Sequence, residues 1–184
     1  MDSGSQSYRR FLAGDDSGLA EIIRDYGDGL ILYLNSIVNR LSEAELLAED
    51  TFVRLAVKKP RDNGKGSFRT WLYAIGRNLA IDHLRKQRRQ KTVPLEDAEQ
   101  WQYEQQALEE AYIREEGRIR VHRAMEALKP EYRQVLWLVY FEGFSCREAA
   151  GIMGKSVHAA ETLAYRARLA LKALLEQEGF DGLS

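Results

Sequence analysis

Apolar residues recur at three- and four-residue spacing through most of the chain, and this period indicates helices. In the first half, the helical pattern covers five segments: Ser7 to Ala13, Asp16 to Tyr26, Gly29 to Asn39, Ser42 to Val57 and Ser67 to Arg89. The alternating β-branched residues that are typical of strands are missing. The sequence therefore predicts an all-α fold.

Capping and loop residues predict several helix ends. Ser42 and Glu45 have the spacing of a capping box, which predicts that a helix starts at this serine. The segment KPRDNGKG at 59–66 is rich in loop-forming residues and predicts a connection. Pro130 predicts the first turn of a later helix. That helix would supply core residues to the C-terminal part of the chain: Tyr132, Val135, Leu136, Leu138 and Val139.

The last forty-odd residues have the pattern of a helix-turn-helix unit. Ser145 and Glu148 form a second capping-box pair before a short apolar helix. Gly154 can adopt the positive φ that ends this helix, and Ser156 can cap the next one. Units of this kind place their second helix in the major groove of DNA.

The second helix of this unit would have an apolar stripe of small and medium side chains: Ala160, Ala164, Ala167, Leu171 and Leu174. Its opposite face and flanks would present polar side chains: His158, Glu161, Thr162, Tyr165, Arg166, Arg168 and Lys172. A helix that reads base edges needs close packing on the inner side and hydrogen-bonding groups on the outer side. An ordinary bundle helix with a solvated face is the alternative interpretation.

A net charge of −1 conceals a strong segregation of charge along the chain. Residues 1–91 carry 16 Lys and Arg against 12 Asp and Glu, and residues 118–184 carry 10 against 8. Residues 92–117 carry 1 basic residue against 8 acidic residues. We interpret this acidic middle as a linker, helical toward its end, between one domain at 1–91 and another at 118–184.

The segment from Gly66 to Lys86 mixes aromatic residues with arginine and asparagine. On a helical wheel, Phe68 and Trp71 share one face, while more outward positions carry Tyr73, Arg77 and Arg85. Such a surface beside a flexible Gly-Lys-Gly loop can stack unpaired bases and hold their backbone. Core packing is the alternative for the first two aromatics, and the helix macrodipole is the alternative for the basic run at 85–91.

The remaining composition disfavours catalytic, cofactor and metal chemistry. No apolar run is long enough for a transmembrane helix, and residues 1–10 do not resemble a signal peptide, so we expect a cytoplasmic protein. A single cysteine, Cys146, excludes an intrachain disulfide and a multi-cysteine zinc site. The three histidines are scattered. The segment NGKGS at 63–67 lacks the order of a phosphate-binding loop and follows no predicted strand. We expect no enzyme activity, no metal and no cofactor.

Three segments together resemble the extracytoplasmic-function sigma factors, which form group IV of the sigma-70 family of bacterial RNA polymerase subunits. Residues 43–54 resemble the family's polymerase-clamp helix, residues 68–85 its −10 helix, and residues 128–168 its −35 domain. The resemblance covers nearly the whole chain. It implies an N-terminal helical bundle and a C-terminal four-helix domain with the helix-turn-helix, joined by the acidic linker.

The resemblance also implies a function in transcription initiation. The chain would bind the β and β′ subunits of core RNA polymerase, recognise the −10 and −35 promoter elements and help to melt DNA. An anti-sigma protein is implied as a further partner, and any membrane contact would come through it. A helix-turn-helix repressor or activator with a helical sensing domain is the alternative. That alternative leaves the segments at 43–54 and 66–86 without a role.

Site roles follow from the resemblance residue by residue. The polymerase would be bound by Glu45, Glu49, Asp50, Phe52 and Arg54. The −10 element would be bound by Lys65, Phe68, Arg69, Trp71, Tyr73, Arg77, Asn78 and Arg85, with the loop at 59–67 receiving a flipped base. The −35 element would be bound by His158, Glu161, Thr162, Tyr165, Arg166 and Arg168.

Four positions depart from the family pattern. Leu46 and Glu49 stand where aspartate and glutamine are usual, and Leu163 stands where arginine is frequent. Glu161 replaces a usual lysine or arginine. A carboxylate accepts a hydrogen bond from cytosine N4 but cannot bond guanine O6 or N7, so the −35 sequence would differ from the family's commonest. Pairing with a neighbouring surface cation is the alternative for this glutamate.

Overall fold

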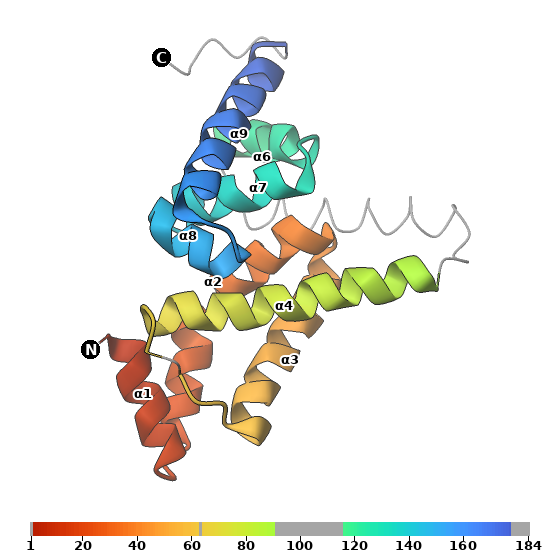
Figure 1. Ribbon diagram of the computed structural model, residues 1–184. Helices are drawn as coiled ribbons and strands as arrows, with labels where there is room; N and C mark the ends of the chain where they lie inside the picture. The colour runs from red at the N-terminus through yellow and green to blue at the C-terminus, as the bar shows by residue number, and fades with distance from the viewer. Residues whose placement is uncertain (1, 63, 91–115, 178–184) are drawn as a thin grey trace.

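The computed structural model describes residues 2–62, 64–90 and 116–177, and every regular element in these ranges is a helix. The N-terminal part contains α1 (Ser3–Leu12), α2 (Ser17–Val38), α3 (Leu41–Lys58) and α4 (Phe68–Arg89). The C-terminal part contains α6 (Glu116–Glu126), α7 (Pro130–Leu136), the π-helical turn η1 (Trp137–Phe141), α8 (Cys146–Met153) and α9 (Val157–Gln177). Figure 1 shows the two groups of helices, which confirm the predicted all-α fold. All of the predicted linker except residues 116 and 117 lies outside the described residues.

The N-terminal helices form a bundle in which α2 contacts α1, α3 and α4. Its core includes fully buried side chains from α2 and α4, among them Leu30, Leu34 and Leu72. The prediction of two separate helices within residues 16–39 is wrong, since α2 is continuous through Gly27 and Gly29. Packing along the whole length of α2 outweighs the low helix propensity of these two glycines.

Two helix starts in the N-terminal domain differ in their capping. Ser67 caps α4, because its side chain accepts a hydrogen bond from the Thr70 backbone N–H. The predicted capping box at Ser42 and Glu45 is wrong, because α3 begins at Leu41 and has no side-chain cap. Leu41 is 1% exposed, so burial of this leucine fixes where the helix starts.

The C-terminal helices contain the predicted helix-turn-helix. Ser145 and Glu148 make both hydrogen bonds of a capping box at the start of α8, and Gly154 ends this helix with a φ of 65°. Ser156 Oγ then accepts a hydrogen bond from the Ala159 backbone N–H at 3.1 Å. The inward alanines of α9 are buried, which lets this helix pack closely against its neighbours: Ala160, Ala164 and Ala167.

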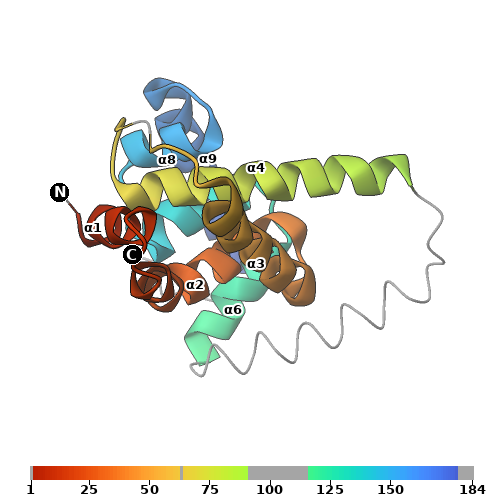
Figure 2. The same ribbon diagram turned by 90° about the horizontal axis from the view of Figure 1, so that it is seen from below.

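The two domains pack directly against each other. Helix α8 contacts α4, and α7 contacts α2. Figures 1 and 2 show α8 lying against the first half of α4, whereas the C-terminal end of α4 extends beyond the neighbouring helices. Within the described residues, no helix has the length and apolar character that a membrane crossing requires.

Candidate nucleic-acid and polymerase interfaces

The outer face of α9 is open to solvent. His158, Glu161 and Arg166 are exposed, and Tyr165 is 59% exposed. Thr162 is half-buried beside them. Among the residues that the structure describes, the Glu161 carboxylate has no ion pair or hydrogen bond. The predicted −35 residues on this face are therefore exposed to a partner.

The predicted −10 residues divide into two groups along α4. Asn78 and Arg85 lie exposed in the second half of the helix, where further exposed cations follow: Lys86, Arg88 and Arg89. Arg69, Tyr73 and Arg77 lie in the first half and contact the C-terminal domain. In this arrangement the predicted −10 surface is open at Lys65 in the preceding loop and along the second half of the helix.

Three aromatic residues that the resemblance assigned to partner surfaces are buried instead. Phe68 is completely buried, and its ring centroid lies 5.6 Å from those of both Tyr8 and Trp71. Phe52 is 7% exposed within the N-terminal core, and Tyr73 is 1% exposed. Burial of large aromatic side chains stabilises a small domain strongly, so these residues serve packing in the structure. Trp71 is half-buried.

The loop from Lys59 to Ser67 is fixed to the bundle at its base. Tyr8 Oη donates a hydrogen bond to the Pro60 carbonyl at 2.6 Å, and burial, with the Asp62 charge, raises the pKa of Tyr8 to about 12. The phenol is therefore protonated at neutral pH and remains a donor. Gly64, Lys65 and Gly66 are exposed at the tip. A fixed base and an exposed tip suit a loop that receives a nucleotide.

Helix α3 presents an exposed apolar stripe. Leu46, Val53 and Val57 are 61%, 57% and 75% exposed, and their spacing of seven and four residues places them on one face. Among them lie exposed acidic side chains: Glu45, Glu49 and Asp50. Exposed apolar residues that gather on one face mark protein interaction sites. The two valines were not predicted as surface residues, because a helical period does not distinguish a second apolar face from the core face.

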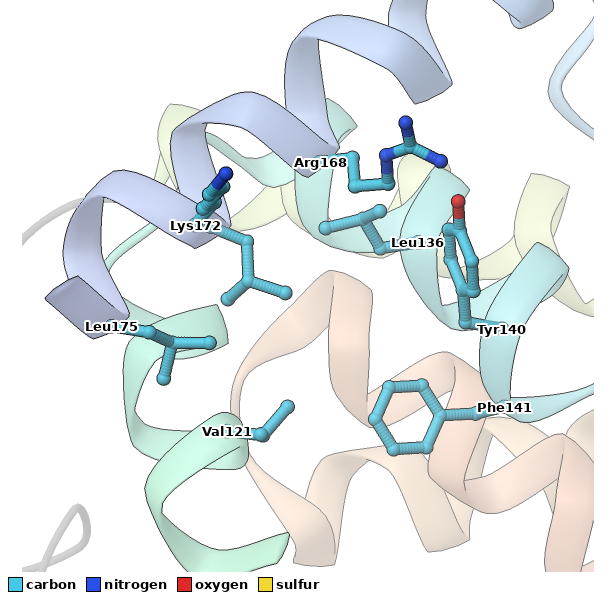
Figure 3. Close-up of a pocket in the computed structure, with 8 residues that line it drawn as sticks. Val121, Leu136, Tyr140, Phe141, Arg168, Lys172 and Leu175 are labelled. Carbon is cyan, nitrogen blue, oxygen red and sulfur yellow. The ribbon is translucent and has the colours of Figure 1, made fainter. Parts of the chain in front are cut away.

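The C-terminal domain contains an apolar groove of about 530 Å³ between α6, η1 and α9. Figure 3 shows Tyr140 and Phe141 on one side of it and Leu175 on the other, with Arg168 and Lys172 at its edge. This groove had no signal in the sequence, because the π turn that directs both aromatics outward does not follow the helical period. Arg168, predicted as a DNA contact, lies where the groove meets the outer face of α9.

Comparisons with known proteins show which family this sequence matches. The family description "Sigma-70 region 2" matches residues 22–90, and "Sigma-70, region 4" matches residues 118–171. The chain is 27% identical over 184 residues to the RNA polymerase sigma-H factor of Pseudomonas aeruginosa, covering 96% of this chain and 95% of that protein. It is 30% identical over 155 residues to the ECF RNA polymerase sigma factor SigM of Bacillus subtilis, covering 84% of this chain and 93% of that protein.

A solved structure has the same fold. The sigma factor RpoE of Bartonella quintana, in complex with the anti-sigma factor NepR, matches with a TM-score of 0.64 and 20% sequence identity. The match covers 88% of this chain and 98% of that one. At this identity the likeness concerns the arrangement of helices.

Proposed function

Because this chain belongs to the extracytoplasmic-function group of sigma-70 family RNA polymerase sigma factors, we propose a role for each of its surfaces. The protein binds core RNA polymerase, recognises −10 and −35 promoter elements and helps to melt DNA at the start of transcription. Members of this family are non-enzymatic initiation factors. We assign this chain no catalytic activity and no cofactor, and a place of action in the cytoplasm, where polymerase and promoter meet.

The exposed outer face of α9 is the main observation that supports DNA binding. Small buried alanines bring this helix close to α8, and hydrogen-bonding side chains project from the other side. A major groove accepts a helix of this kind. We assign the −35 element to residues 118–184 and the −10 element, with clamp binding, to residues 1–91.

Reconstitution with core RNA polymerase tests the function as a whole. A sigma factor should form a stable complex with core polymerase and start transcription at specific sites on genomic DNA. A helix-turn-helix repressor should bind duplex DNA alone and give no transcription with the core enzyme. The second result would overturn the proposal.

Asn78 should read one base of the −10 element. Replacement by alanine removes an exposed base-edge contact worth about 1 to 3 kcal/mol and should relax the preference at a single −10 position. Selection from a randomised promoter library with reconstituted holoenzyme measures this preference. Gln90→Ala removes another exposed amide near the end of the same helix and serves as the control. An unchanged preference in the Asn78 variant would contradict the assignment.

Glu161 should accept a hydrogen bond from cytosine N4 in the −35 element. Replacement by lysine should move the preferred base at one position from cytosine toward guanine, because lysine donates to guanine O6 and N7. Selection from a randomised −35 library measures the change. Glu176→Lys makes the same change of charge on the same helix, beyond the helix-turn-helix, and should leave the base preference unchanged. Equal effects of both substitutions would reduce Glu161 to a general electrostatic role.

Two surfaces are proposed for protein partners. We assign the apolar stripe of α3 to the polymerase clamp, since exposed apolar side chains that gather on one face mark protein interaction sites. The groove of the C-terminal domain would accept an apolar helix with acidic flanks, because two cations lie at its edge. We infer that core RNA polymerase, through its β and β′ subunits, and an anti-sigma protein are the partners that use these surfaces.

A further inference from the structure

An enclosed carboxylate of the C-terminal domain binds two side chains in the first half of α4. Glu142 follows the π turn, and its side chain is 11% exposed. Its carboxylate accepts hydrogen bonds from Arg69 Nη2 at 2.5 Å and from Tyr73 Oη at 2.8 Å. Arg69 also donates to the Glu142 backbone carbonyl at 2.8 Å and lies 4.1 Å from the centroid of the Phe144 ring. We call these four residues the Glu142 cluster.

The Glu142 cluster fits closely between three helices. A Cβ placed on Gly29 of α2 would lie 2.6 Å from Tyr73 Oη and 3.1 Å from a Glu142 carboxylate oxygen, so only glycine leaves room for this pair. Burial, and then the Glu142 charge, raise the pKa of Tyr73, which keeps the phenol a donor at neutral pH. The close fit indicates a specific docking of the two domains.

Two further hydrogen bonds join the domains around this cluster. Arg77 Nε donates to Gln134 Oε1 at 3.2 Å, and the buried Arg133 donates through Nε to the Ser36 carbonyl at 2.5 Å. Three of the predicted −10 residues in the first half of α4 are thus bound to the C-terminal domain: Arg69, Tyr73 and Arg77. The outer face of α9 stays exposed in this docked arrangement, as do Asn78 and Arg85 of α4.

We propose that Glu142 occupies the place of a nucleic-acid phosphate on Arg69, so that the first half of α4 binds either the C-terminal domain or single-stranded DNA. The inference rests on the proposed role of α4 in binding the −10 strand. An arginine guanidinium accepts carboxylate and phosphate oxygens in the same fork geometry, so the two compete for it. In the docked arrangement the proposed −35 face on α9 stays open, whereas the C-terminal domain covers part of the proposed −10 face on α4. Binding to polymerase would have to separate the domains before the −10 strand can be held.

A reversible cross-link tests whether the closed arrangement excludes the strand. A Cβ on Gly151 of α8 would lie 4.0 Å from Thr70 Cγ2 of α4, which is close enough for a disulfide between cysteines at these positions. In a Cys146→Ser background, Thr70→Cys with Gly151→Cys should cross-link in the free chain on mild oxidation with diamide. The oxidised protein should bind a labelled single-stranded DNA of about 15 nucleotides and mixed sequence much more weakly than the same protein after reduction.

Removal of the carboxylate tests the role of Glu142 itself. Glu142→Ala should slow the cross-link and tighten binding of the single strand by about tenfold, because apparent affinity scales with the fraction of open chain. Glu131→Ala is the matched control, since it removes another carboxylate of the same domain, one that pairs with Lys155 at 3.2 Å and lies away from α4. This control should change neither the cross-link nor the binding by more than about twofold.

The possible outcomes separate the inference from the proposed function. Failure of the cysteines to cross-link, equal binding by oxidised and reduced protein, or equal effects of both alanine substitutions would overturn the inference alone. If Glu142→Ala slows the cross-link but the opened chain still does not bind the strand, then the first half of α4 is not a DNA surface. That result would overturn the proposed role of this helix together with the inference.

Discussion

Replacing Gly18 by alanine is expected to lower the free energy of unfolding by about 2 to 4 kcal/mol. A Cβ at this position of α2 would clash with the Ser7 carbonyl oxygen, because it would lie much closer than van der Waals contact allows. It would also lie 2.9 Å from the Phe11 backbone nitrogen. Both are backbone atoms of α1, so no side-chain rotation relieves the overlap. Helix α1 would have to move away and expose Tyr8 and Phe11, which are now buried.

Gly27 in the same helix provides the matched control for this change. A Cβ there meets nothing closer than Ile23 Cγ2 at 4.0 Å, so Gly27→Ala should raise the free energy of unfolding by about 0.5 to 1 kcal/mol through helix propensity. Urea unfolding followed by circular dichroism measures both values. If both substitutions changed the free energy of unfolding in the same direction, the result would contradict the close approach of α1 to α2.

Val53→Asp is expected to weaken binding of core RNA polymerase by more than about tenfold, as loss of a central apolar contact does at protein interfaces. Val53 is 57% exposed and lies in the middle of the apolar stripe of α3. The substitution places a charge in a surface that the partner must desolvate. It should change the free energy of unfolding by less than about 0.5 kcal/mol, because the valine is not part of the core.

Ile23→Asp is the control for this prediction. Ile23 is another exposed apolar residue of the N-terminal domain, at 44% exposure, and lies on α2 instead of α3. Both variants should fold, and only the α3 variant should lose the polymerase. Competition with the unmodified chain for core enzyme, followed by native gel electrophoresis, compares them directly. Equal binding of core polymerase by the two variants would contradict the assignment of the apolar stripe to the interface.

Local sequence signals predicted the features of the fold that depend on neighbouring residues. The helix-turn-helix is an example, since the capping box at Ser145, the positive φ of Gly154 and the cap at Ser156 each involve a few consecutive residues. The continuity of α2 could not be predicted in this way. Gly27 and Gly29 favour a break locally, but contacts with helices distant in the sequence hold them in a helix.

Part of the candidate site could likewise be predicted from local sequence patterns, and part could not. The outer face of α9 was identified correctly as a solvent-facing surface, because its alanine stripe shows which side is buried. Phe52 and Phe68 were assigned to partners by resemblance but lie in the core. The docking of Glu142 onto Arg69 and Tyr73 had no sequence signal. These residues are about 70 positions apart, and only the packing of the two domains brings them together.

The π turn at Trp137–Phe141 positions both the apolar groove and the Glu142 contact between the domains. Both therefore depend on the number of residues in this turn. The Glu142 backbone N–H donates to the Trp137 carbonyl, so the turn contains one residue more than an α-helical turn. In an α-helix each residue rotates the direction of the side chain by about 100°. A single deletion in this turn would therefore swing Tyr140 and Phe141 out of the groove and Glu142 away from Arg69 in the same step. During divergence, this segment can accept substitutions one at a time, but a change in its length alters the groove and the domain contact together.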